Sequence, residues 1–180
     1  MAIGGFVASA QSNIDPREWK VVAPPGAGFE ALMPGAPEIE QGTQETAAGK
    51  VEVQMFASKP SGRKELFAIV AIQFPREIGA QPDGAEKLLE LGQKNVVDAC
   101  RGKVQSKKPI DLRGVPGWEL EVLTAGGAIV KSRVFATQGR LFQLTVHVSR
   151  FRLASADVQK FFDAFQVSTE TSTASGRADD

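Results

Sequence analysis

Few residues of this sequence could carry out catalysis. His147 is the only histidine and Cys100 the only cysteine among the 180 residues, and there is no tyrosine. Any acid–base scheme near neutral pH would therefore have to use His147. Ser149 lies two residues further along the same predicted strand, which is not the strand-to-helix turn that exposes a nucleophilic serine. We predict no catalytic residues and no enzymatic activity, and a hydrolase using His147 is kept as an alternative.

The sequence also lacks recognisable metal and cofactor motifs. One cysteine and one histidine cannot complete a Cys/His zinc site, and a single cysteine cannot form an internal disulfide. The segment 26–28, Gly-Ala-Gly, precedes a predicted strand, so it does not place a helix N-terminus beside a dinucleotide phosphate. We therefore predict neither a metal site nor a cofactor.

Polar residues that could bind a ligand occupy alternate positions of predicted strands near the C-terminus. A three-residue loop that ends in glycine, 125–127, connects two of these strands. This loop places Glu121 opposite Lys131 and Glu119 opposite Arg133. Opposite charges across an antiparallel ladder stabilise a sheet by about 0.2–1 kcal/mol per pair. The same charges could instead line a groove for a polar ligand.

A second three-residue loop, 137–139, sets the register of the last strand. It pairs Lys131 with Thr145 and Arg133 with Gln143, whereas a two-residue loop would shift the register and mix polar with apolar residues, so we reject that loop. The expected apolar face carries Trp118, Leu120, Val122, Val130, Val134, Phe142, Leu144, Val146 and Val148. The expected polar face supplies the candidate ligand- or partner-binding residues Glu119, Glu121, Lys131, Arg133 and His147.

The elements that position these residues are mainly strands. Alternating patterns predict strands at 19–23, 29–33, 38–46, 50–58, 66–74 and 103–112, followed by the three C-terminal strands. The segment 66–74 is apolar on both alternating sides, which is typical of a central strand covered on both faces. A helix follows Pro82, with Asp83 as its cap and Gly102 as its left-handed stop, and a second helix starts near Ser155.

The two ends of the chain differ from the middle. Ala8-Ser9-Ala10 before Gln11 has the small-x-small pattern of a signal-peptidase site, although no basic residue precedes Arg17. We predict that 1–17 is a residual signal peptide or a disordered N-terminus, that 18–167 is one domain, and that 168–180 is a disordered tail. The signal-like segment predicts an extracytoplasmic location, either periplasmic or secreted.

Charge and hydropathy exclude two classes of partner. The 21 basic residues balance the 21 acidic ones, so binding of nucleic acid through bulk charge is not expected. No apolar run approaches the roughly 20 residues that span a bilayer. We therefore expect a protein partner, with no nucleic acid and no transmembrane segment.

Three segments of the sequence resemble PsbP-like proteins. They are Trp19-Lys20 with the segment 28–37 (GFEALMPGAP), the segment 139–144 (GRLFQL), and the segment 161–165 (FFDAF). The resemblance implies an α+β domain in which an antiparallel sheet of about seven strands is flanked by two or more helices as an α/β/α sandwich. Proteins with this fold have different functions, and the matching motifs contain no catalytic residues.

These observations together predict a non-catalytic binding or assembly module outside the cytoplasm. Such a module would recognise a protein or a small polar ligand. The alternatives are a cytosolic chaperone or adaptor, and the hydrolase described above.

Overall fold

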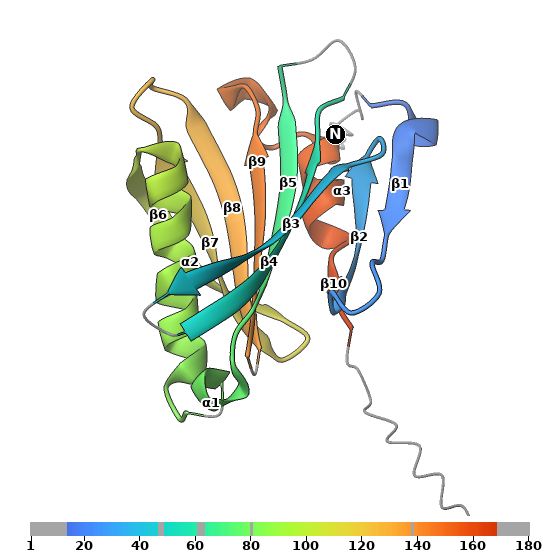
Figure 1. The fold of residues 1–180 in the computed structure, drawn as a ribbon. Coiled ribbons are helices and arrows are strands. Elements are labelled where there is room, and N and C mark those ends of the chain that lie inside the picture. Colours follow the sequence, from blue (N-terminus) through green and yellow to red (C-terminus); the bar gives the residue numbers. More distant parts are fainter. Residues whose placement is uncertain (1–13, 47–48, 61–63, 80, 138, 169–180) are drawn as a thin grey trace, which may run out of the picture.

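Two antiparallel sheets and three α-helices make up the fold in the computed structural model, which describes residues 14–46, 49–60, 64–79, 81–137 and 139–168 (Figure 1). In spatial order, the seven-stranded sheet contains β3 (Glu38–Thr46), β4 (Gly49–Ser58), β5 (Leu66–Gln73), β9 (Arg140–His147), β8 (Ile129–Thr137), β7 (Val115–Leu123) and β6 (Lys103–Leu112). The three-stranded sheet contains β1 (Trp19–Val22), β2 (Phe29–Pro34) and β10 (Gln166–Val167). The helices are α1 (Arg76–Gly79), α2 (Gly84–Cys100) and α3 (Ala156–Asp163), with 3-10 turns η1 (Pro16–Glu18) and η2 (Arg150–Arg152). The predicted α+β class with a seven-stranded antiparallel sheet is confirmed.

Helix α2 covers one face of the large sheet. Its buried residues Leu88, Leu89 and Val96 belong to one apolar cluster with Leu120 and Val134 of the sheet. These positions recur at helical spacing, so they place one stripe of α2 on the sheet and leave the opposite side in water. This contact fixes α2 over β7, β8 and β9.

The ends of α2 differ from the prediction. The carboxylate of Asp83 pairs with Lys87 at 2.9 Å and caps no backbone N–H. Arg101, with a φ of 46°, occupies the left-handed position that was expected for Gly102. A Cβ at Gly102 would lie 2.6 Å from the carbonyl oxygen of Leu123. Gly102 is therefore needed for close packing against β7, and it is not needed to end the helix.

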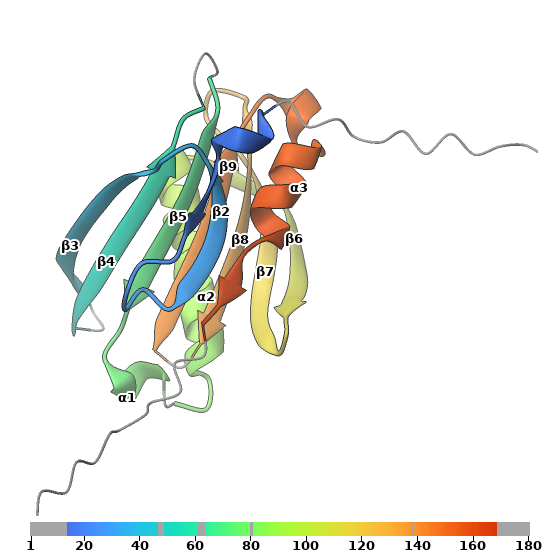
Figure 2. The ribbon, with the colours of Figure 1, turned by 90° about the vertical axis from the view of Figure 1, so that its right-hand side faces the viewer.

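The opposite face of the large sheet is covered jointly by α3 and the small sheet (Figure 2). The layer between them is aromatic: Phe165 stacks on Phe29 and Phe135, and its ring also meets that of Phe142 edge-on. This aromatic layer on one face and the apolar cluster beneath α2 on the other bury apolar side chains on both faces of the large sheet. The prediction that the central strand β5 is covered on both sides is confirmed.

The register of the last three strands was predicted correctly for only one of the two pairs. Glu119 lies opposite Arg133 and Glu121 opposite Lys131, as expected. The pair β8–β9 is shifted by one residue, because Thr137 pairs with Arg140 and leaves two residues between the strands. The rejected two-residue loop is therefore the correct one.

The shift reverses the faces predicted for β9. Phe142, Leu144 and Val146 lie on the same face as Lys131 and Arg133 and pack in the aromatic layer. The prediction failed because it assumed one wet face, whereas both faces are covered here. Under that condition, charged and apolar residues can share one face, because ion pairs and hydrogen bonds offset the cost of burying charges such as Glu119 and Arg133.

Candidate functional site

Three of the five predicted binding residues form one ion-pair cluster. Lys131 Nζ lies 3.0 Å from Glu119 Oε1, and Arg133 Nε donates to Glu119 Oε2 at 2.9 Å. All three side chains are between 17% and 25% exposed, so the cluster is mostly screened from solvent. Burial acts to raise the pKa of Glu119, but hydrogen bonds from Arg133 and Lys131 outweigh it and hold the pKa below its ordinary value.

The cluster also holds α3 against the sheet. Arg133 Nη1 contacts Asp163 Oδ1 at 3.1 Å, and its guanidinium lies 4.8 Å from the centre of the Phe162 ring. A side chain that contacts a sheet carboxylate, a helix carboxylate and an aromatic ring has a clear structural role. Binding of a ligand or partner by Glu119, Lys131 and Arg133 stays a prediction.

Glu121 and His147 lie outside this cluster. Glu121 is opposite Lys131 in the ladder, but no ion pair joins them in the described structure. His147 pairs with Val130 and therefore lies on the face that carries α2, opposite to the face of Lys131. The side chains of His147 and Ser149 are both exposed, and no hydrogen bond links them among the described residues. The five residues predicted to share one surface thus occupy two faces of the sheet.

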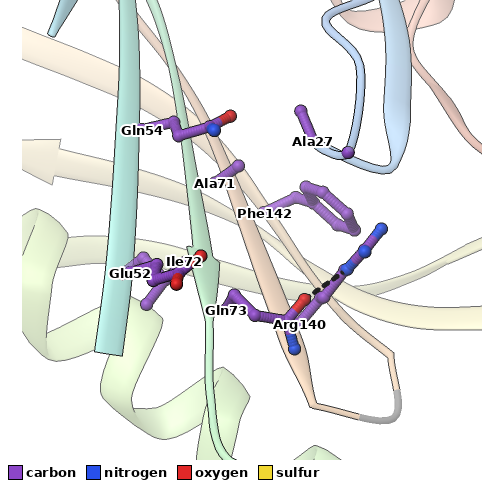
Figure 3. A pocket seen from close by; sticks show the side chains of 9 residues that line it. Ala27, Glu52, Gln54, Ala71, Ile72, Gln73, Arg140 and Phe142 are labelled. Atoms are coloured by element: carbon purple, nitrogen blue, oxygen red, sulfur yellow. Dashed lines mark hydrogen bonds between the residues drawn. The ribbon is translucent and has the colours of Figure 1, made fainter. Parts of the chain in front are cut away.

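A cleft of about 170 Å³ is a better site for a ligand, and it lies between the β1–β2 loop and the large sheet. It is lined by Gly26 and Ala27 of the loop, Glu52 and Gln54 of β4, Ala71, Ile72 and Gln73 of β5, and Arg140 and Phe142 of β9 (Figure 3). The ladder explains why these residues meet: Glu52, Gln73 and Arg140 lie side by side across three neighbouring strands. The polar row ends where the aromatic layer begins at Phe142.

Arg140 is held in place at this cleft by its neighbours. Its Nε donates to Gln73 Oε1 at 2.5 Å (Figure 3). The amide nitrogen of Gln73 donates in turn to the carbonyl oxygens of Phe74 at 3.1 Å and Gly139 at 3.0 Å, which fixes the orientation of the amide. A cation held in this way is preorganised, so a ligand would not have to order it on binding.

Gly28 makes room for the guanidinium of Arg140. The φ of Gly28 is +74°, and a Cβ at this position would lie 1.7 Å from Arg140 Nη1. Both the backbone conformation and the close approach therefore require glycine. The 26–28 segment, which the sequence analysis set aside as a phosphate loop, instead forms part of the cleft wall.

The cleft also contains an acceptor without a partner. Gln54 Oε1 is buried and accepts no hydrogen bond from any described residue. Gln54 extends from β4 toward the loop that carries Ala27 (Figure 3). An unsatisfied buried oxygen costs about 1–3 kcal/mol, a cost that a donor on a bound molecule would remove. The lining thus combines a cation, a carboxylate and two amide side chains, groups that can bind a small polar molecule.

Sequence reasoning missed this cleft because its residues come from four separate segments and share no local motif. The row that joins Arg140 to Gln73 and Glu52 depends on the pairing of β5 with β9 and with β4, for which the sequence predicted no register. The available signals were Arg140 directly after Gly139 and the glycine pair in 26–28, and neither predicts a contact between them.

Cys100 lies at the last residue of α2 and is partly buried against the apolar cluster beneath that helix. Burial raises the pKa of its thiol, which favours the unreactive protonated form. This position is typical of a small packing residue.

A buried ion-pair group lies where η2 and the start of α3 meet. Arg152 contacts Asp157 at 2.6 Å and Glu65 at 3.1 Å, and Asp157 is fully buried. The backbone N–H of Ile14 also donates to Asp157, at 3.4 Å. These contacts join the first described residue to α3, so we interpret the group as structural.

The described part of the chain shows neither a metal-binding cluster nor a helix that could span a membrane. No three His, Cys, Asp or Glu side chains in it come together as metal ligands. None of its helices has the length and apolarity needed to cross a bilayer.

Comparisons with known proteins identify the fold. No family model and no curated protein matches the chain. The solution structure of cyanobacterial PsbP (CyanoP) from Synechocystis sp. PCC 6803 superposes with a TM-score of 0.56, covering 93% of this chain and 98% of that one at 15% identity. A Bacteroides thetaiotaomicron VPI-5482 protein reaches a TM-score of 0.46 at 12% identity, covering 85% of this chain and 50% of that one. The chain therefore has the PsbP-like fold that the sequence resemblance implied.

Proposed function

We propose that this protein is a non-catalytic binding module that acts outside the cytoplasm, and that its cleft binds a small zwitterionic ligand of about the size of an amino acid. The buried, unpartnered oxygen of Gln54, in a cleft that Arg140 also lines, is the observation that supports this proposal.

The charges around the cleft suggest the ligand class. The positive charge of Arg140 attracts a carboxylate, and Gln54 Oε1 accepts from an ammonium or amide N–H. Glu52 and Arg140 flank Gln73 on neighbouring strands, which puts their backbones roughly 10 Å apart. Opposite charges on the same cleft fit a molecule that carries both charges better than a dianion, which Glu52 would repel.

Isothermal titration calorimetry with glycine, L-alanine, L-glutamine and succinate tests the cleft. We expect the amino acids to bind and succinate to bind more weakly. Arg140→Met should weaken amino-acid binding about tenfold or more, because a charge-assisted bond contributes roughly 1.5–3 kcal/mol. Arg150→Met, an exposed residue on η2 that does not line the cleft, is the matched control. Equal binding by wild type and Arg140→Met, or no binding of any probe at millimolar concentration, would reject the site.

The proposed location depends on residues 8–11, which lie outside the described residues. N-terminal sequencing of the protein from its native host should give a mature chain that begins at Gln11. An intact Met1 in the cytosolic fraction would instead support the alternative of a cytosolic chaperone or adaptor.

A further inference from the structure

The two edges of the seven-stranded sheet are built differently. An exposed edge strand can pair with another chain, and proteins commonly block such edges with proline, lysine or a bulge. Edge strand β6 has all three features: Pro109, three lysines, and a register shift between Val104 and Ser106. Edge strand β3, with the sequence EIEQGTQET, has none of them.

The register shows which backbone groups of β3 face outward. Thr46 pairs with Gly49 across two intervening residues, and a pair that closes such a short loop exchanges both of its hydrogen bonds. Bonded and non-bonded pairs then alternate along the strand. The N–H and C=O groups of Ile39, Gln41, Thr43 and Glu45 therefore point away from β4, toward the open edge seen at the side of the sheet in Figure 2.

The same alternation shows which backbone groups of β6 face outward and where this outward row is interrupted. Leu112 pairs with Val115 across two residues, so Ile110 and Lys108 also bond to β7, and the groups of Asp111, Pro109 and Lys107 face outward. Proline has no N–H, so Pro109 removes a donor from the outward row. Of the two edges of the large sheet, β3 is therefore the one that offers a partner strand a continuous ladder.

The side chains of β3 indicate the charge of the partner. The strand carries Glu38, Glu40 and Glu45 and no basic residue. Ile39 is 56% exposed, although its partner Phe56 on β4 is fully buried. An acidic strand with one exposed apolar side chain complements an extended segment that is basic and has an apolar residue near its middle.

We propose that β3 binds an extended basic segment of a partner protein by β-strand addition. The segment becomes an eighth strand of the large sheet. Backbone hydrogen bonds at 39, 41, 43 and 45 provide the affinity, and the three glutamates select for lysine or arginine. This inference uses no residue of the cleft lining, so it can succeed or fail independently of the ligand proposed above.

The probe is a fluorescent nine-residue peptide that alternates lysine with valine and threonine, and binding is measured by anisotropy. We expect saturable binding that weakens with added salt, and slowed amide exchange at Gln41 and Thr43 in the complex. A glutamate version of the peptide should bind at least about tenfold more weakly. A lysine peptide with alternate amides N-methylated should not bind, because it cannot complete the ladder; this control leaves the protein unchanged.

Variants of the protein distinguish the contribution of the β3 backbone to peptide binding from the contribution of its side chains. Thr43→Pro removes an outward N–H and should weaken peptide binding about tenfold, whereas Thr43→Ala keeps the N–H and should bind within about twofold of wild type. Glu40→Lys should weaken binding and reduce its salt dependence. Circular dichroism checks that each variant is folded.

Three results would overturn the proposal. They are equal affinity for the lysine and N-methylated peptides, equal affinity for the lysine and glutamate peptides, and self-association of the protein that Thr43→Pro abolishes. The last result would mean that a second copy of this chain occupies the edge.

Discussion

At the scale of single residues, two glycines of the β1–β2 loop have the same backbone conformation but different surroundings. Gly26 and Gly28 have φ values of +76° and +74°. A Cβ at Gly26 would meet nothing within 4 Å, whereas a Cβ at Gly28 would overlap the guanidinium of Arg140. Alanine substitutions at these two positions therefore distinguish the free-energy cost of backbone strain from the cost of displacing Arg140.

We predict that Gly26→Ala and Gly28→Ala both destabilise the protein, because L-residues disfavour the left-handed region by about 1–2 kcal/mol. Gly28→Ala should cost roughly 1 kcal/mol more, since it also breaks the bond from Arg140 to Gln73. Urea denaturation measures both differences. Equal losses for the two variants would show that Arg140 is not held as described.

The ion pairs of Glu119 predict a specific pH dependence. Its pKa is lower in the folded protein than the ordinary 4.5, so the unfolded chain binds a proton more readily. The stability that this group contributes is therefore complete above pH 4.5 and is lost as the pH falls through the lower folded pKa. Glu119→Gln removes this contribution, so its destabilisation should be about 1 kcal/mol near pH 7 and should shrink in acid.

Denaturant titrations of wild type and Glu119→Gln between pH 7 and pH 3 check this expectation. The control is Glu90→Gln, since Glu90 is exposed on α2 and makes no ion pair among the described residues. A gap between wild type and Glu119→Gln that stays constant with pH would contradict the assignment.

At the scale of elements, a glycine of α2 lies tightly against the large sheet. A Cβ at Gly92 would lie 2.4 Å from Val134 Cγ1 and 3.2 Å from Leu141 Cδ1. Helix propensity alone favours alanine over glycine by about 1 kcal/mol, but overpacking a core costs about 1–3 kcal/mol.

We predict that Gly92→Ala is destabilising by about 1–2 kcal/mol, because the clash exceeds the gain in helix propensity. Thermal and urea unfolding measure the change. A more stable Gly92→Ala variant would mean that α2 can move away from the sheet without loss, and the packing described for this layer would be wrong.

The sequence allowed the elements to be predicted better than their pairing. The alternation in 66–74 was sufficient to identify a strand covered on both faces, and the three-residue loop 125–127 gave the correct register of Glu119 against Arg133. Loop length also decided the register of β8 against β9. There no pair of opposite charges could check the result, and the loop was read one residue too long. The cleft could not be predicted, since it depends on contacts between the loop at Gly28 and a residue on β9.

At the scale of the whole molecule, one aromatic side chain lies where α3, the small sheet and one face of the large sheet meet. The ring of Phe165 is fully buried, with its centre 5.6 Å from that of Phe29, 5.8 Å from Phe135 and 5.6 Å from Phe142. It follows α3 directly and precedes β10, so it contacts helix, small sheet and large sheet together.

We predict that Phe165→Ala costs about 3–5 kcal/mol, the usual range for emptying a large buried site. The matched control is Phe151→Ala: Phe151 is 98% exposed, so its removal should change stability by no more than about 0.5 kcal/mol. Guanidinium denaturation compares the two variants. Similar losses at both positions would contradict the layer arrangement.

The pairing of β2 with β10 has a consequence for how the chain matures on the ribosome. Strand β2 is made early, but Ser168 donates to the carbonyl oxygen of Gly28, so its partner β10 is translated after all the other described strands. Until then, the aromatic layer lacks the side chains of α3 and Phe165, and such exposed nascent surfaces are prone to aggregate. A chain that stops before α3 should therefore aggregate or need chaperones, whereas a chain that includes Phe165 and β10 should fold unaided.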